Sequence, residues 1–121
     1  MALYAESNPP EFIVTAGDNF YTLGVASTTD SMWISLWSDI YLTYSSLRVP
    51  WYSVLGNHDY GYGDKGVAAQ IGRTAVDEYW NMPATNYSRV FDLPGGGKMV
   101  IVFIDTTTLA PSQNKCCNQN G

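Results

Sequence analysis

The sequence is poor in basic residues. Its 121 residues include six Lys and Arg against 11 Asp and Glu, which gives a formal net charge of −5. Nucleic-acid binding depends on clusters of Lys and Arg that neutralise phosphates, and the basic residues here are scattered. We therefore expect no nucleic-acid partner. A protein of this charge that handles phosphate needs another source of positive charge, and bound metal ions can supply it.

Long apolar runs are also missing. No stretch approaches the ~18 consecutive apolar residues typical of a membrane-spanning helix. Residues 1–6 lack the basic and apolar regions of a signal peptide. We therefore predict no membrane span and no signal peptide in this chain. The content of 45% hydrophobic and 14% aromatic residues fits one modest globular domain.

Cysteine is scarce, and the two that occur, Cys116 and Cys117, are adjacent. Disulfide geometry restricts the Cα separation, so neighbours in sequence rarely pair with each other. We expect any disulfide partners to lie outside this chain. The polar residues 114–121 lead to no further predicted element, so we also expect the chain to stop within a domain.

Two short apolar runs, residues 12–16 and 51–55, each end at a polar loop and are typical of buried strands. Apolar residues between them recur at steps of three and four, which predicts an amphipathic helix with an apolar face in the core, begun by Thr29 or Asp30. That face comprises Trp33, Leu36, Trp37, Ile40, Tyr41, Tyr44 and Leu47. Strand, helix and strand predict a parallel βαβ unit, whose two polar loops then meet at one edge of the sheet.

The second half of the chain predicts a helix and a hairpin. A Gly-rich loop at 60–66 precedes a weakly helical stretch over residues 67–80. Residues 89–93 and 98–105 flank a Pro-Gly-Gly-Gly turn and predict a β-hairpin. Because residues 98–104 are nearly all apolar, we expect a central strand that is covered on both faces.

The two polar loops hold the side chains that could carry chemistry. The first reads Gly17-Asp18-Asn19-Phe20-Tyr21 and offers a carboxylate and a phenol. The second reads Gly56-Asn57-His58-Asp59 and offers an amide oxygen, an imidazole and a second carboxylate. A Gly-Asp pair alone is usually only a turn, but two such loops after consecutive strands are a more specific pattern.

These loops resemble the GDxxY and GNHD motifs of purple acid phosphatases, within the calcineurin-like metallophosphoesterases. The similarity extends through residues 49–52, 69–71 and 104–106 and is greatest to the small tartrate-resistant type. The resemblance implies an α/β fold, a four-layer α/β/β/α sandwich. Residues 1–121 would form a partial domain of this kind, without its first strand and its C-terminal half.

The resemblance also implies a role for each loop residue. Asp18 would bridge two metal ions, Tyr21 would bind Fe(III) as a phenolate, and Asn57 would bind a divalent ion (Fe, Zn or Mn). A bridging carboxylate offsets the repulsion between the cations, and a tyrosine needs a strong Lewis acid to bind as phenolate at neutral pH. His58 would be catalytic, contacting the phosphoryl group or protonating the leaving alkoxide.

The implied activity of the parent protein is hydrolysis of phosphoric monoesters by a metal-bound hydroxide. The family resemblance places such a parent in the secreted or the endolysosomal and vacuolar pathway. Asn86-Tyr87-Ser88 is an N-glycosylation sequon that agrees with this location.

The chain also departs from the family pattern. It has no aspartate before Asp18, where the family has one, and His58 is its single histidine, whereas the family has three metal-binding histidines after the central strands. With at most three ligands, the metal set is incomplete. We expect this chain alone to be inactive and, because sheet edges would be exposed, prone to aggregate.

Alternative interpretations stay open. The chain could be a truncated non-catalytic relative that binds phosphate or a protein partner, or its parent could be a nucleotidase, phosphodiesterase or nuclease, against which Tyr21 argues. Asp59 could orient His58 or cap a turn, and Asp105 could face the site or close its strand. Residues 60–63 could line the substrate entrance or form a surface loop.

Overall fold

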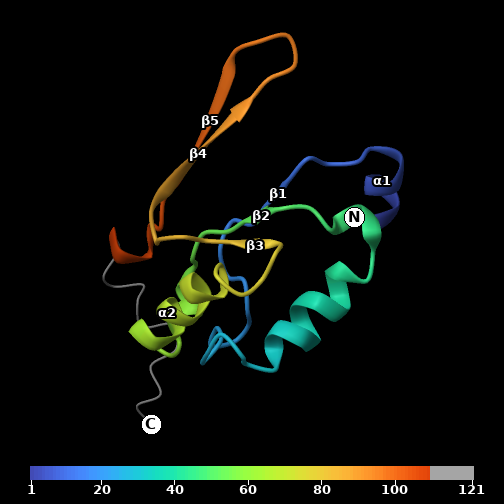
Figure 1. Cartoon of the computed structure of the whole chain (residues 1–121). Helices are drawn as coiled ribbons and strands as arrows, with labels where there is room; N and C mark the ends of the chain where they lie inside the picture. Colours follow the sequence, from blue (N-terminus) through green and yellow to red (C-terminus); the bar gives the residue numbers. More distant parts are fainter. Residues whose placement is uncertain (110–121) are drawn as a thin grey trace.

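The computed structural model describes residues 1–109, which form two small sheets flanked by helices (Figure 1). Strands β1 (Ile13–Val14), β2 (Trp51–Tyr52) and β3 (Trp80–Asn81) form a parallel sheet in that order. Strands β4 (Tyr87–Asp92) and β5 (Lys98–Phe103) form an antiparallel hairpin. The helices and helical turns are α1 (Ala2–Ser7), η1 (Trp33–Leu42), η2 (Ser45–Leu47), η3 (Asn57–Tyr60), α2 (Asp64–Arg73) and η4 (Thr107–Leu109). The predicted α/β class is confirmed.

The βαβ unit is present as predicted. β1 and β2 are parallel, with Ile13 opposite Trp51, and η1 lies between them in the chain. Each strand is two residues long. Beyond β1 and β2, a side chain connects the two polar loops. The Asn19 amide donates to the Val54 carbonyl (2.9 Å) and accepts from the Thr15 hydroxyl (2.7 Å). Both polar loops therefore leave the sheet at the same edge.

The helix between β1 and β2 differs from the prediction in its winding. It spans Trp33–Leu42 and is a π-helix, and residues 45–47 form a separate short turn. A π-helix makes i→i+5 hydrogen bonds, so its turn is wider than that of an α-helix. Residues at four-residue steps then share the inner face, and Trp33 and Trp37 are buried while Leu36 and Ile40 are exposed. Only part of the predicted apolar face therefore belongs to the core.

The start of η1 also differs in detail from the prediction. Its N-cap is Met32, neither Thr29 nor Asp30. The Asp30 carboxylate instead accepts hydrogen bonds from the backbone N–H groups of Met32 (3.0 Å) and Ala26 (2.8 Å). Asp30 thus organises the turn that leads into η1. Among residues 1–109, no helix combines the length and the apolar character needed to cross a bilayer.

Four tryptophans form the centre of the core and fix η1 against the sheet. Trp37 packs edge to face on Trp51 and Trp80, with ring centroids 4.8 and 5.3 Å apart, and Trp33 packs on Trp80 at 4.9 Å. Each indole N–H donates to an acceptor, as buried donors require. The acceptors are Ser27 O, Asp77 Oδ2, Leu47 O and Gln70 O. This layer supports the strands from which the two polar loops begin.

The helix predicted over residues 67–80 is shorter and starts earlier, and the chain enters β3 at Trp80. Asp77 accounts for this change of direction. Its Oδ1 accepts hydrogen bonds from the N–H groups of Tyr79 (2.9 Å) and Trp80 (3.2 Å), and its Oδ2 accepts from Arg73 (2.7 Å). Burial would raise the pKa of Asp77, but these hydrogen bonds and the Arg73 charge hold it below its ordinary value.

Asp77→Asn is expected to lower the free energy of unfolding by about 1–3 kcal/mol, because buried donors lose a charged acceptor. Since folding lowers the pKa of Asp77, its contribution is complete above the unfolded value of 3.8 and is lost as the pH falls through the folded value below it. Urea unfolding at neutral pH measures the loss. Asp39→Asn, at an exposed position of η1, is the control. Equal stability of the two variants would contradict this role.

The hairpin forms as predicted, but the expectation that β5 is covered on both faces is wrong. Its side chains alternate, and Val100 and Val102 are 58% and 62% exposed. Among the described residues β5 pairs only with β4, and the inner face of the hairpin packs on residues 12 and 52. The hairpin projects away from the parallel sheet (Figure 1), so its outer face lacks a covering layer within residues 1–109.

Candidate metal centre

The two polar loops touch through glycines. A Cβ atom on Gly56 would lie 2.3 Å from both the backbone nitrogen and the Oδ1 atom of Asp18, and one on Gly17 would lie 2.8 Å from the nitrogen of Gly56. Neither position has room for a side chain. Gly17 additionally has a φ of +95°, which glycine adopts without cost. The close approach brings the first loop directly against the start of η3.

Asp18 is held between both loops. Its backbone lies in the left-handed region with φ of 49°, where Asp is more common than most residues. Oδ1 accepts a hydrogen bond from the backbone N–H of His58 (3.1 Å), and Oδ2 accepts one from the Tyr21 hydroxyl (2.8 Å). The carboxylate is therefore oriented by one residue from each motif.

The three predicted metal ligands lie on the same pocket. Asp18, Tyr21 and Asn57 line an open cavity of about 420 Å³. Thr106 and Thr107, at the end of the hairpin, form another part of its wall. Sequence reasoning missed these two threonines, although the Asp-Thr-Thr-Thr run after a strand was visible. The cavity is thus built from three segments that are far apart in the chain.

His58 lies beside these ligands but does not line the same cavity. Its Nδ1 atom is 2.8 Å from the Thr22 carbonyl oxygen, and its ring packs against the Tyr21 ring with centroids 4.7 Å apart. Because a carbonyl oxygen only accepts, this contact requires the proton on Nδ1. In the neutral imidazole the Nε2 atom is then the acceptor.

The donor chemistry fits part of an oxygen-rich metal centre. Residues that carry a carboxylate, a phenol and an amide line one cavity, and hard cations prefer oxygen ligands. The phenol proton of Tyr21 occupies the line between its oxygen and Asp18, and it would be released when the phenolate binds a cation. Within residues 1–109, no three His, Cys, Asp or Glu side chains gather as a ligand group. The described residues therefore offer a partial set.

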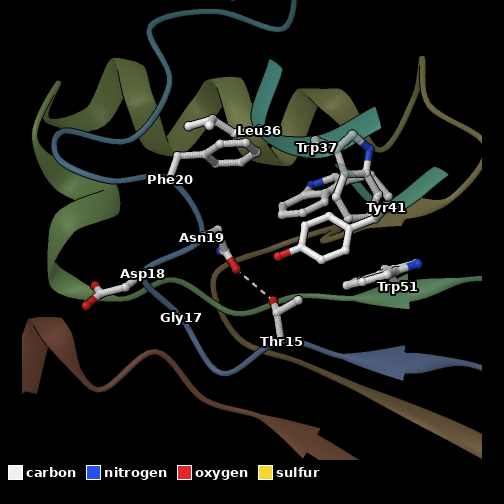
Figure 2. A pocket seen from close by; sticks show the side chains of 10 residues that line it. Thr15, Gly17, Asp18, Asn19, Phe20, Leu36, Trp37, Tyr41 and Trp51 are labelled. Carbon is white, nitrogen blue, oxygen red and sulfur yellow. Dashed lines mark hydrogen bonds between the residues drawn. The ribbon is translucent and has the colours of Figure 1, made fainter. Parts of the chain in front are cut away.

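A second cavity, of about 200 Å³, lies on the other side of the first loop. Figure 2 shows it lined by aromatic side chains of η1 and β2, with the Thr15–Asn19 hydrogen bond at its polar end. The Asp18 carboxylate points away from this aromatic group. The loop thus separates an aromatic cavity from the polar one.

Asp59 is fully buried behind the two loops. It accepts hydrogen bonds from the backbone N–H groups of Asn19 (3.1 Å), Phe20 (3.3 Å) and Gly56 (2.9 Å), and from the Gln70 amide (2.8 Å). The bond to Gly56, three residues earlier, fits the turn-capping interpretation of Asp59. Burial raises the pKa of Asp59, while these four donors oppose the increase.

Asp105 and Tyr60 join the hairpin to η3. The Tyr60 hydroxyl donates to Asp105 Oδ2 at 2.5 Å, and the Thr107 N–H donates to Oδ1 at 2.9 Å. Asp105 is buried, and these contacts fit the strand-closing interpretation. Burial, and then the hydrogen bond to the carboxylate, raises the pKa of Tyr60. The pair positions Thr106 and Thr107 on the cavity wall.

Comparison with known proteins gives a consistent result. The model of the calcineurin-like phosphoesterase family matches residues 2–115. Tartrate-resistant acid phosphatase type 5 from Oryctolagus cuniculus is 37% identical over 109 residues, and its counterpart from Homo sapiens is 34% identical over 110. These alignments cover 89% and 90% of this chain and 33% of each relative.

A plant protein is also similar. Purple acid phosphatase 3 from Arabidopsis thaliana is 46% identical over 72 residues, which is 58% of this chain and 19% of that protein. The resemblance inferred from the two motifs is thereby confirmed. The chain spans about a third of the length of the acid phosphatases from animals that it matches.

Proposed function

Because the chain belongs to the calcineurin-like phosphoesterase family, we propose that the protein that carries it is an acid phosphatase that hydrolyses phosphoric monoesters. The observation that supports this most directly is the convergence of Asp18, Tyr21 and Asn57 on one cavity. The names of the relatives, acid phosphatases from animals and a plant, agree with it.

In this proposal Asp18, Tyr21 and Asn57 hold part of a binuclear metal centre. Asp18 would be shared between the two ions, the Tyr21 phenolate would hold Fe(III), and Asn57 would hold a divalent Fe, Zn or Mn ion without adding charge. Bound metal ions supply Lewis acidity toward the phosphoryl oxygens and activate water as the nucleophile. The small number of Lys and Arg residues is then compatible with phosphate binding, because the bound ions would provide the positive charge.

His58 handles a proton in this scheme. The Thr22 carbonyl accepts a hydrogen bond from Nδ1, so the protonated ring would use its second proton, on Nε2, to donate to a phosphoryl oxygen or to protonate the leaving alkoxide. The packing of its ring against Tyr21 restricts the imidazole to one orientation. A positioned general acid contributes about 10²–10⁴-fold to a rate.

We further propose that residues 1–121 act as a partial domain and are inactive without additional ligands. Three oxygen donors, one of them shared, do not close the coordination of two ions. The alternative of a non-catalytic relative makes a different prediction. Such a protein would bind phosphate or a protein partner and would show no turnover even with flanking sequence and metals supplied.

The experiment compares the full-length protein, purified with iron and zinc available, on an aryl phosphate monoester and a bis-aryl phosphate diester at acid pH. We expect turnover of the monoester in preference to the diester, together with a visible phenolate-to-iron absorption band. Tyr21→Phe should abolish the band. Preference for the diester would favour a phosphodiesterase, and the absence of any turnover would favour the binding role.

We also propose that the parent enters the secretory, endolysosomal or vacuolar pathway and is glycosylated at Asn86. This side chain is exposed at the start of β4, and its Oδ1 accepts a hydrogen bond from the Asp105 N–H (2.9 Å), which leaves Nδ2 as the site of attachment. Expression through a eukaryotic secretory pathway should give a mass that falls on glycosidase treatment. Asn86→Gln should remove that difference, and an unchanged mass in the wild-type protein would contradict the proposal.

A further inference from the structure

The buried carboxylate of Asp59 contacts both metal-binding loops without facing their cavity. Asp59 is 0% exposed and follows His58 directly in η3. It is absent from the residues that line the cavity of Asp18, Tyr21 and Asn57. Its hydrogen bonds instead end on backbone N–H groups on either side of these ligands. Asn19 and Phe20 follow Asp18, and Gly56 precedes Asn57.

Gln70 completes this arrangement from α2. It is also 0% exposed, and its amide nitrogen donates to Asp59 Oδ1 at 2.8 Å. Its amide oxygen accepts from the Asn19 side chain at 3.2 Å. The side chains of Asn19, Asp59 and Gln70 therefore contact one another in a closed ring. Asn19 belongs to the first loop, Asp59 to the second and Gln70 to α2.

We propose that Asp59 and Gln70 are positioning residues that fix the separation between Asp18 and Asn57. The His58 N–H donates to Asp18 Oδ1 and links the two loops at the Asp18 ligand itself. The Asp59 carboxylate adds backbone hydrogen bonds to Asn19 and Phe20 of the first loop and to Gly56 of its own loop. Gln70 holds this carboxylate from α2. A metal centre needs its ligands placed within narrow limits, which long loops alone do not provide.

The chemistry explains why a carboxylate is required at position 59. Oδ1 faces the N–H groups of Asn19, Phe20 and Gln70, and Oδ2 faces those of Asn19 and Gly56. Asparagine would place an NH₂ group against at least two of these donors in either orientation, although its size is nearly the same. Asp59→Asn is therefore expected to disturb both loops while it preserves the packing.

A matched control exists in Asp77, which is also enclosed by N–H donors but lies at the turn before β3. It accepts bonds from Tyr79, Trp80, Trp37 and Arg73, none of which line the cavity. Asp77→Asn should lower stability, as Asp59→Asn does, without moving the two loops. Comparison of the two variants therefore separates a positioning role from general destabilisation.

The test measures backbone hydrogen exchange in the metal-free full-length protein, and then retention of iron and zinc against a chelator. In Asp59→Asn we expect exchange at Asn19, Phe20 and Gly56 to become at least about tenfold faster. Metal retention should weaken by about 10–100-fold. Asp77→Asn should change neither. Gln70→Leu should give a smaller increase in exchange at the same three amides, because Asp59 keeps its backbone hydrogen bonds but loses the donor that holds it from α2.

Unchanged loop exchange in Asp59→Asn, or an equal increase in Asp77→Asn, would overturn the proposal. Unchanged loop exchange in Gln70→Leu would overturn the role of Gln70. The metal-retention measurement rests on the proposed function, whereas the hydrogen-exchange measurement does not. If the protein binds no metal, the proposed function fails, and hydrogen exchange still decides whether Asp59 positions the loops. If the protein is an active metal phosphatase but exchange is unchanged, only this inference fails.

Discussion

Asp18→Asn is expected to reduce phosphomonoester hydrolysis by the full-length protein by more than about 100-fold, because loss of residues that merely support metal ligands costs 10–100-fold. Asp18 is the ligand proposed to be shared by both ions. In one of the two orientations of the asparagine amide, an NH₂ group replaces the Oδ2 atom that faces the Tyr21 hydroxyl. Asparagine tolerates the left-handed backbone at position 18 as aspartate does. The change therefore tests the charge and not the local conformation.

Initial rates on an aryl phosphate and metal content on the same samples measure this effect. Metal content should fall together with the rate. Asp39→Asn, which removes one negative charge from the exposed surface of η1, is the control and should keep both. If Asp18→Asn retains two metals and wild-type activity, the bridging role is wrong.

Gly56→Ala is expected to have the second largest effect, a loss of about 100-fold in activity, since a displacement of about 1 Å at a catalytic group can cost that much. The backbone of Gly56 has φ of −112° and ψ of 179°, which any residue can adopt. Glycine is required here by space alone. The added methyl carbon would lie 2.3 Å from two Asp18 atoms, one of them in the backbone, so the loops must separate.

Gly72→Ala in α2 is the matched control. Its added carbon would meet only the Thr28 methyl group, at 3.1 Å, and alanine favours a helix. Circular dichroism during thermal unfolding establishes whether Gly56→Ala is folded at the assay temperature. A folded Gly56→Ala variant with undiminished activity would show that the contact between the two loops is not required.

Local patterns predicted the part of the fold that depends on neighbours in sequence. The apolar runs before Gly17 and Gly56 predict the parallel strands β1 and β2, and the turn residues at 94–97 predict the hairpin. The strand β3 was missed because no apolar run like residues 12–16 or 51–55 surrounds it, and because the end of α2 depends on hydrogen bonds to the Asp77 side chain. Helical spacing also did not reveal the π-helical winding of η1.

The candidate site divides in the same way. The positions of Asp18, Tyr21 and Asn57 on one cavity follow from two loops at one edge of a parallel sheet, which the sequence predicts. Thr107 and Gln70 join the site through contacts across long stretches of chain, which composition and spacing do not encode. The exposure of β5 was misjudged for a related reason, since an apolar run does not specify which layers cover it.

Metal removal tests whether the proposed binuclear centre carries the activity. Metal content and aryl phosphate hydrolysis would be measured on one preparation of the full-length protein, before chelation, after chelation and after iron and zinc are returned. We expect about two metal ions per chain, loss of activity with the metal, and recovery of both together. Activity that persists in the metal-free protein, or a metal-loaded protein that never hydrolyses a phosphomonoester, would contradict it.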